Sequence, residues 1–581
     1  MFQQSLDPVN GSLALSALCG ALPLLTLFVL LGNLRIRAWV AGLASLGVTL
    51  VVAVVLFGMP VGQTLLAGTP GAAFGFFPIL WIVLNAIWVY NLTVATGHFD
   101  VLRRSFETVS ADQRVQAIII AFCFGALLEA LAGFGTPVAI TVVMLMALGF
   151  APVKAATVAL IANTAPVAFG ALATPIVTLA TVTGGANGDP RLNVDTLGAM
   201  VGRQTPVLAV IVPLILVLVV DGRRGLRQAW LPALVAGLTF GVAQFAAANY
   251  VSVPLTDIIA ALVAAASVVL LLRVWQPSEV LLSDRDPKAP ESGTSAAPRG
   301  AMVGGRPETA AGGTAASRAT SKESTGGTGS GPDDRADVAR AYAPYLVIVA
   351  IFSITNIAAV KAFLAKEPFT YVFGWPGLHV LNPSGDPVAS TMYTFNWLPA
   401  AGTLMVLAGL ITAVILKVSR GRALRAYVET YVELRSAILT VMAVLALAYV
   451  MNLSGQTGSL GAWLAGAGGA FVLISPVLGW LGVAVTGSDT SANALFGALQ
   501  VQTATSAHLD PVLMAAANSS GGVLGKMVSP QNLAIAAAAV GMAGREGEIF
   551  RKVLGWSLLM LVLMCLLVFL QSTPVLDWMV P

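Results

Sequence analysis

The chain has 581 residues, of which 57% are hydrophobic and only 10% are charged. Soluble globular domains carry roughly 25% charged residues, so a water-soluble fold of this composition would expose a large apolar surface. The net charge of +4 is small and the basic residues lie in short loops, which argues against a nucleic-acid-binding surface and favours a membrane protein oriented by its loop charges.

Ten segments resemble membrane spans, which need about 20 mainly apolar residues. They are 13–31, 38–57, 76–96, 205–220, 231–248, 256–273, 342–362, 397–416, 436–451 and 553–572. Two longer apolar regions, 116–182 and 470–543, are interrupted by Gly, Pro, Asn, Thr and Ser. Residues 276–340 are rich in Gly, Ser, Thr, Ala, Pro and charge, so we expect a disordered loop there.

Lysine and arginine predict the orientation of these spans. Basic residues follow the first and third spans, 205–220, 256–273 and 397–416, and precede 553–572, whereas four segments have none: 1–12, 58–75, 249–255 and 452–469. The positive-inside rule therefore places the 276–340 loop in the cytoplasm and the four segments without lysine or arginine, with both termini, outside. Four basic residues run against this orientation: Arg191, Arg203, Lys361 and Lys366.

The two interrupted regions resemble each other. Asn163-Thr164 is followed by Gly170 and Thr174-Pro175, and Asn518-Ser519 is followed at the same spacing by Gly525 and Ser529-Pro530. A glycine-containing segment precedes each set: Gly133 to Pro137 in the first and Gly487 to Ser491 in the second. Matched motifs at matched separations indicate an internal duplication.

The charge pattern predicts that the two copies are inverted. The first glycine segment lies between the basic 97–115 loop and Lys154, so 116–152 is expected to be a re-entrant hairpin that enters from inside. The second lies between segments without lysine or arginine, so 470–506 is expected to enter from outside. Inverted repeats of this kind are typical of secondary transporters.

The predicted fold is an all-α polytopic membrane protein with inverted repeats, about 12 transmembrane helices, two re-entrant hairpins and two broken helices. Residues 1–220 form the first repeat unit, with broken helix 156–182, and 221–275 form linking helices. The loop 276–340 then leads to the second unit, 341–581, with broken helix 511–543.

Broken helices expose backbone groups that can bind ions. A helix N-terminus favours a carboxylate, while free carbonyls and hydroxyls can bind a cation or a hydroxyl group. Hairpin tips facing broken helices near the midplane would form one small polar cavity. We therefore expect the cavity to be lined by polar residues of both motifs: Asn163, Thr164, Asn518, Ser519, Thr136, Thr490 and Ser491.

Three charged residues lie within the expected hairpins and broken helices: Glu129, Asp489 and Lys526. An intramembrane charge costs at least ~2.5–3.5 kcal/mol and is usually functional. The two carboxyl groups are candidates for proton coupling, although each could instead accept a structural hydrogen bond. Lys526 is a candidate for binding a substrate carboxylate; it could also pair with Glu129 or Asp489, or extend to the interface.

Several long motifs resemble those of the bacterial L-lactate permease family, which belongs to a wider ion-transporter superfamily. They are GALLEALAGFGTPVAIT (125–141), NTAPVAFGA (163–171), VGRQ (201–204), SPVLGWLGVAVTGSDTSANALFGALQ (475–500) and GGVLGKMVSPQNLAIA (521–536). The resemblance runs over nearly the whole chain, although the 276–340 loop is longer and more polar than the family pattern. It implies uptake of lactate with protons across the bacterial inner membrane, with glycolate as a related substrate, and an elevator-like movement.

The sequence alone leaves two couplings open. A proton symporter of lactate or a similar 2-hydroxy acid, D-lactate and glycolate included, fits the buried carboxyl groups, whereas hairpin carbonyls could hold Na⁺ in a sodium-coupled carboxylate transporter. The chain has no Walker A motif and no nucleophile–base pair, so we expect neither ATP-driven transport nor an enzyme. We expect no cofactor, no metal and no nucleic-acid partner; the oligomeric state stays open.

Overall fold

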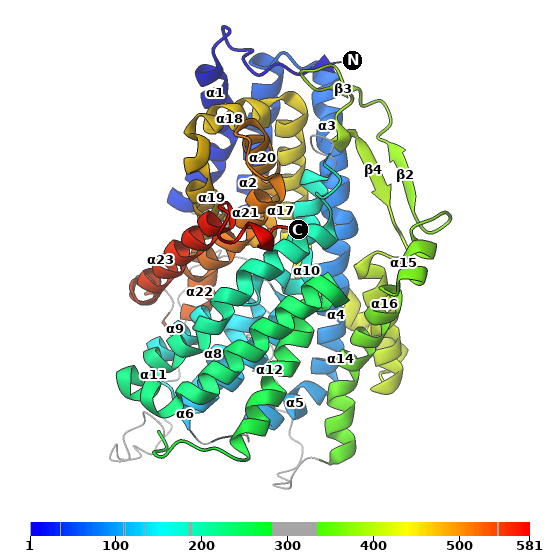
Figure 1. The fold of residues 1–581 in the computed structure, drawn as a ribbon. Coiled ribbons are helices and arrows are strands. Elements are labelled where there is room, and N and C mark those ends of the chain that lie inside the picture. The colour runs from blue at the N-terminus through cyan, green and yellow to red at the C-terminus, as the bar shows by residue number, and fades with distance from the viewer. Residues whose placement is uncertain are drawn as a thin grey trace, which may run out of the picture.

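The computed structural model describes residues 2–34, 36–107, 110, 112–133, 135–184, 189–281, 334–542 and 545–581. These residues are mostly helical (Figure 1). Ten helices among them are long and apolar enough to cross a membrane, or eleven if the bent pair Pro152–Ala162 and Val167–Thr183 is one span. The chain is therefore a multi-pass α-helical membrane protein. The expectation of twelve crossings stays a prediction, and residues 282–333 of the expected loop lie outside the described residues.

The first part of the chain forms helices α1 (Leu13–Phe28), α2 (Ala38–Val55), α3 (Val61–Phe74), α4 (Trp81–Ala95) and α5 (His98–Glu107). The segment 58–75, which has no lysine or arginine and is not among the expected spans, is therefore mostly helical. A π-helical segment, Gly75–Leu80, joins α3 to α4. The many small residues of α3 allow close packing against another helix. A Cβ on Gly71 would lie 2.5 Å from the carbonyl oxygen of Leu445 in α17 (Arg420–Ser454), so the two helix backbones lie close together. Small residues and prolines in a charge-free segment thus mark a packed helix here.

Two antiparallel helices then form the first hairpin. Its first arm comprises α6 (Gln113–Gln116), a π-helical segment (Ala117–Phe124) and α7 (Gly125–Ala132), and its second arm is α8 (Thr136–Ala147). Gly135 at the tip has φ +87°, a left-handed conformation that favours glycine. The arms pack along each other, with Gly125 facing Thr141.

The first broken helix follows the first hairpin. It consists of α9 (Pro152–Ala162), a 3₁₀ turn (Val167–Phe169) and α10 (Gly170–Thr183), and its halves are bent by 64°. Inside α10, Ala171, Leu172 and Ala173 all have left-handed backbone angles, with φ from +43° to +58°. The helix predicted over 156–182 is thus broken, with its bend between Ala162 and Val167.

Long helices link the two halves. α11 (Val194–Ala246) departs from helical geometry at Asp221, Gly222 and Ala229, and α12 (Thr256–Leu272) follows it after a short connection. The next described helices are α14 (Arg335–Thr355), α15 (Ala358–Leu364), α16 (Ala401–Ile415) and α17 (Arg420–Ser454). Between α15 and α16, β2 (Tyr371–Gly374) pairs antiparallel with β4 (Met392–Phe395), and β3 (Val380–Leu381) pairs in parallel with β1 (Phe2–Gln3).

The second hairpin and second broken helix complete the fold. α18 (Gln456–Leu464) occupies part of the expected loop 452–469 and packs against α1. The hairpin arms are α19 (Phe471–Thr486) and α20 (Asp489–Ser506), with Gly487 at φ +78° between them. The broken helix comprises α21 (Pro511–Gly525), a 3₁₀ turn (Lys526–Val528) and α22 (Pro530–Ala539). α23 (Glu546–Gln571) is the last described helix that is long enough to cross a membrane.

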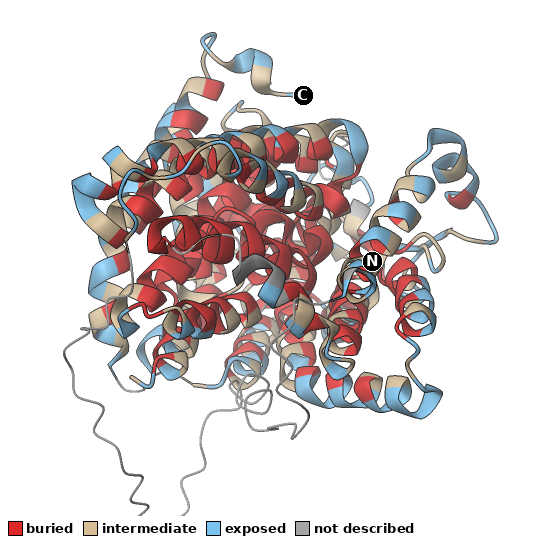
Figure 2. Cartoon of the chain, turned by 90° about the horizontal axis from the view of Figure 1, so that it is seen from below, coloured by how far each residue is buried: buried red, intermediate tan, exposed pale blue. Residues whose placement is uncertain are grey.

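The two motifs interlock. α8 of the first hairpin packs against α22 of the second broken helix, and α20 of the second hairpin packs against α10 of the first. A Cβ on Gly135 would lie 2.3 Å from Cδ1 of Ile535, and one on Gly497 would lie 2.8 Å from Cγ2 of Val182. Buried residues concentrate in the centre of the molecule (Figure 2). The polar residues of the hairpins and broken helices are therefore enclosed by protein.

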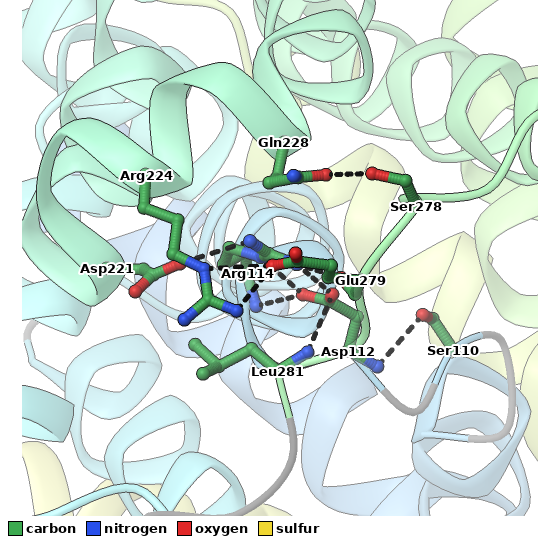
Figure 3. Close-up of polar contacts among 9 residues, drawn as sticks. All are labelled: Ser110, Asp112, Arg114, Asp221, Arg224, Gln228, Ser278, Glu279 and Leu281. Atoms are coloured by element: carbon green, nitrogen blue, oxygen red, sulfur yellow. Dashed lines mark hydrogen bonds and ion pairs between the residues drawn. The ribbon is translucent and has the colours of Figure 1, made fainter.

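A buried ionic network fixes the base of the first hairpin (Figure 3). The fully buried Arg114 pairs with Asp112 at 2.6 Å and with Asp221, at the kink of α11, at 3.0 Å. Its guanidinium also donates to the carbonyl oxygen of Glu279, after α12, and Asp112 accepts from the backbone N–H of Leu281 at 3.1 Å. The network ties the hairpin to α11 and to the segment after α12.

Two of the four basic residues that disagree with the expected orientation form ion pairs with acidic residues. Arg191 pairs with Asp189 at 2.8 Å and Asp510 at 2.9 Å, and Lys361 pairs with Asp195. The hydrogen bond from Arg191 lowers the pKa of Asp189 below its usual value, so this carboxylate stays ionised and compensates the arginine charge near neutral pH.

Candidate functional site

The centre of the candidate site is an ion pair between the two halves of the chain. Lys526 Nζ lies 2.5 Å from Oε1 of Glu129, and the two side chains are 7% and 3% exposed. Glu129 lies on α7, one turn before the tip of the first hairpin, and Lys526 directly follows α21 at the break of the second broken helix. Of the partners considered for Lys526, the structure places Glu129 in contact.

Glycines make room for the Glu129 carboxylate. A Cβ on Gly170 would lie 2.8 Å from Glu129 Oε1, and one on Gly133 would lie 3.3 Å from it. Gly170 is the glycine of the repeated motif, at the start of α10. Its lack of a side chain lets the backbone of the first broken helix pass directly beside the ion pair.

The amide group of Asn163 holds the second carboxylate oxygen. Asn163 ends α9, and its Nδ2 donates to Glu129 Oε2 at 3.0 Å. Glu129 is thus held by an ammonium group on one oxygen and a carboxamide on the other. Asn163 is only 5% exposed, and its Oδ1 has no hydrogen-bond partner within the described residues. The neighbouring Thr164 donates to the carbonyl oxygen of Ile161 at 2.7 Å.

A second polar network surrounds Asp489 in the first turn of α20. Asp489 Oδ2 accepts from Ser519 Oγ at 2.6 Å and from Asn493 Nδ2 at 3.4 Å, while Oδ1 has no partner in the described part of the chain. Asn493 also donates to the carbonyl oxygen of Pro175, so this network touches the first broken helix. Asp489 also interacts electrostatically with Lys526 of the first network, so the charges of the two networks influence each other.

The repeated asparagines have different surroundings. Asn518 Nδ2 donates to Asn493 Oδ1 at 2.9 Å, and its Oδ1 accepts from Gln500 Nε2 at 3.1 Å. Both polar atoms of Asn518 are therefore satisfied by the protein, unlike those of Asn163. The matched position in the sequence does not carry a matched hydrogen-bonding state.

The structure gathers the predicted residues into these two networks: Glu129, Asn163 and Lys526 in the first, and Asp489, Asn518 and Ser519 in the second. Thr136 lies beside the tip of the first hairpin, and Thr490 and Ser491 lie beside that of the second. As far as the described residues extend, the hydroxyl groups of these three residues join neither network.

Another buried carboxyl group close to the site was missed by sequence reasoning. Asp257, in the first turn of α12, is fully buried and accepts from Gln244 Nε2 at 2.8 Å. Gln244 also donates to the carbonyl oxygen of Ala165 at 3.3 Å, inside the first broken helix. Asp257 interacts electrostatically with Glu129. An acidic residue inside the predicted span 256–273 was the available signal, but its place near the helix start is typical of an ordinary first-turn acid.

Two cavities lie near these elements. The smaller, of about 10 Å³, is lined by Thr164, Ala165 and Thr205 together with apolar residues, and has room for about one water molecule. The larger, of about 280 Å³, lies by the α20–α21 connection and the C-terminal segment, where Asp510 and Gln571 line it. The small cavity lies beside the first break, where Thr164 and Ala165 follow Asn163 in the chain.

Comparison with known proteins identifies the family. A model of the family described as L-lactate permease matches residues 16–575. The chain is 39% identical to the L-lactate permease of Bacillus subtilis (strain 168), over 100% of this chain and 99% of that protein. It is 41% identical to "Glycolate permease GlcA" of Escherichia coli (strain K12), over 97% of this chain and 96% of that protein.

Among solved structures, the YdaH transporter of Alcanivorax borkumensis is similar over 84% of each chain, with 13% identity and a TM-score of 0.39, which is too low for a comparison of sites. The sequence matches, in contrast, extend over almost every residue of the chain and of its relatives. The chain therefore belongs to the L-lactate permease family.

Proposed function

We propose that this protein is a secondary active transporter that takes up L-lactate, and related small 2-hydroxy monocarboxylates such as D-lactate or glycolate, with protons across the plasma membrane. The substrate class is supported by the relatives, which are named as lactate and glycolate permeases. The coupling is supported by one observation above all, the buried ion pair between Lys526 and Glu129.

An exchange of carboxylates on Lys526 would couple the binding of lactate to the binding of a proton. In the structure, Lys526 holds the Glu129 carboxylate. When lactate arrives as an anion, its carboxylate replaces that of Glu129 on the ammonium group, and Glu129 takes up one proton. The buried site then remains neutral, whereas an extra unpaired charge in the membrane would cost at least ~2.5–3.5 kcal/mol. One anion therefore binds together with one proton.

Asp489 is the second candidate for proton coupling, because it is buried, has one oxygen without a partner among the described residues, and interacts with Lys526. The remaining polar residues of the two motifs are proposed to line the path of the substrate or to hold the site in shape. They are Thr136, Thr164, Thr490, Ser491, Asn518 and Ser519.

Release of the substrate requires movement, because both members of the ion pair are almost fully enclosed. We propose that the inverted units 1–220 and 341–581 provide it, with the interlocked hairpins and broken helices moving together as one body. The contacts of α8 with α22 and of α20 with α10 support this grouping, since they join each hairpin to the other unit's broken helix.

Uptake of radiolabelled lactate into proteoliposomes tests the function. With the outside more acidic than the inside, we expect lactate to accumulate above its outside concentration, with or without sodium. Dissipating the pH difference with a protonophore should abolish the accumulation. Accumulation driven by a sodium gradient at equal pH would contradict proton coupling and indicate a sodium-coupled carboxylate transporter. Uptake of neither kind would contradict the proposed substrate.

A further inference from the structure

The Asn163 carboxamide has one polar atom in use and one free. Its Nδ2 donates to the Glu129 carboxylate, which fixes the orientation of the amide, since the reverse orientation would set two acceptor oxygens against each other. Oδ1 consequently points away from Glu129, in a side chain that is 5% exposed, and has no partner among the described residues. Most buried polar atoms in folded proteins have a hydrogen-bond partner, so Oδ1 can accept from a donor on a bound molecule. Other buried acceptors, such as Asp489 Oδ1 and Gln500 Oε1, also lack a donor among the described residues, but the Asn163 amide is the one that also holds the Glu129 carboxylate.

The proposed substrate supplies such a donor. A 2-hydroxy acid carries a carboxylate, which accepts hydrogen bonds, next to a hydroxyl group, which can donate one. A carboxamide presents the complementary pair, an N–H donor and a C=O acceptor side by side. We propose that Asn163 is the specificity-determining residue for the 2-hydroxyl group: Nδ2 donates to the substrate carboxylate in place of Glu129, and Oδ1 accepts from the hydroxyl.

The inference rests on the proposed function, because it places the substrate carboxylate on Lys526 where Glu129 now lies. It adds a selection rule. A 2-oxo acid such as pyruvate would set its carbonyl oxygen against Oδ1, so two acceptors would face each other. Propionate, which lacks the hydroxyl, would leave Oδ1 unpaired in a buried site. Both losses should reduce binding about ten- to a hundredfold relative to lactate.

The second repeat provides a matched control. Asn518 occupies the position equivalent to Asn163, but Asn493 and Gln500 satisfy its amide groups. Removing either asparagine creates a buried cavity of the same size. Only the removal of Asn163 takes away a free acceptor beside the ion pair, so only that change should alter the preference between substrates.

Competition experiments in proteoliposomes test the proposal. For the wild-type chain, unlabelled lactate should inhibit labelled lactate uptake at about ten- to a hundredfold lower concentration than propionate or pyruvate. Asn163→Ala removes the amide, and Asn163→Ser removes it but keeps a small polar side chain. In both variants we expect lower uptake, and we expect the ratio of the inhibitory concentration of propionate to that of lactate to fall toward one. Asn518→Ala should lower uptake without changing the ratio.

The outcomes separate the two proposals. A wild-type chain that takes up no lactate contradicts the proposed function. Lactate uptake with an unchanged lactate-to-propionate ratio in the folded Asn163 variants contradicts only the role of Asn163. If neither variant folds, thermal unfolding of the detergent-solubilised wild-type protein decides: lactate should stabilise it at roughly ten- to a hundredfold lower concentration than propionate, and equal stabilisation overturns the inference.

Discussion

Glu129 and Lys526 are 397 positions apart in the sequence, and their side-chain atoms lie 2.5 Å apart in the structure. Glu129 lies on the first hairpin, and Lys526 lies at the break of the second broken helix. Removing either partner leaves the other without its counter-charge in a buried site, which is costly for an ion pair of this kind. The two residues nevertheless have different proposed roles, and their substitutions should have different effects.

Glu129→Gln should abolish the accumulation of lactate driven by a pH difference but retain exchange of labelled for unlabelled lactate. A glutamine keeps the shape of the side chain but cannot exchange a proton, while Lys526 still binds the substrate carboxylate. Uptake and counterflow in the same proteoliposomes measure the two properties separately. If the variant still accumulates lactate against its gradient, Glu129 is not the proton carrier and Asp489 becomes the leading candidate.

Lys526→Ala should eliminate both accumulation and counterflow, because the substrate carboxylate loses its counter-charge. Lys552→Ala removes a lysine from the exposed face of α23 and should leave both activities near the wild-type level. Counterflow by a folded Lys526→Ala protein at the wild-type rate would show that the ammonium group does not bind the substrate.

Gly170→Ala should reduce lactate uptake by a factor of ten or more while the protein still folds, since the added methyl group would lie 2.8 Å from Glu129 Oε1 and displace the carboxylate from Lys526. Gly555→Ala is the control, because a Cβ at that position in α23 would meet no atom within 4 Å. Uptake rates are compared after the amount of folded protein has been matched by size-exclusion chromatography. Equal rates in the two variants would contradict this account of Gly170.

Arg114→Ala should lower the free energy of unfolding by about 3–5 kcal/mol, because it leaves buried Asp112 without its partner. Arg224 lies in the same region but is 59% exposed and pairs with the exposed Glu279, so Arg224→Ala should cost only about 0–1 kcal/mol. Denaturant unfolding in detergent measures both. Similar losses for the two variants would mean that the buried network does not hold the hairpin base.

Ala173→Gly should leave stability nearly unchanged. The left-handed backbone of Ala173 costs about 1–2 kcal/mol that glycine would relieve, and this gain offsets about 0.8 kcal/mol for the lost buried methyl group. Ala159→Gly, in the regular part of α9, has no strain to relieve and should lose about 2 kcal/mol, from helix propensity and burial together. Equal losses in unfolding experiments would show that residue 173 is not strained.

Local signals in the sequence predicted most of the fold elements. The class of protein followed from apolar spans, and the two breaks followed from Pro175, Pro530 and their matched neighbours. The motifs predicted the family, and the comparisons confirm it. Helix α3 was missed, because its glycines and Pro70 are common in loops, and the close packing against α17 that makes them useful depends on a partner far away in the chain.

The site was predictable as a set of residues and not as an arrangement. Glu129, Asp489 and Lys526 are detectable because charge is rare in apolar sequence, but nothing local tells which carboxyl group Lys526 contacts. The free Oδ1 of Asn163 and the satisfied Oδ1 of Asn518 depend on neighbours from other helices, so identical motifs could not reveal the difference. Asp257 was missed since its first-turn position has an ordinary explanation.

The Lys526–Glu129 pair also has an electrical consequence. If one lactate anion and one proton enter together, the loaded site carries the same net charge as the empty one, so neither crosses the membrane as a charged body. Each unpaired charge moved through 100 mV gains or loses about 2.3 kcal/mol. A site that is neutral both when loaded and when empty has no such free-energy change on crossing the membrane. Its transport rate should therefore depend on the concentrations of lactate and protons alone, in energised and de-energised cells alike.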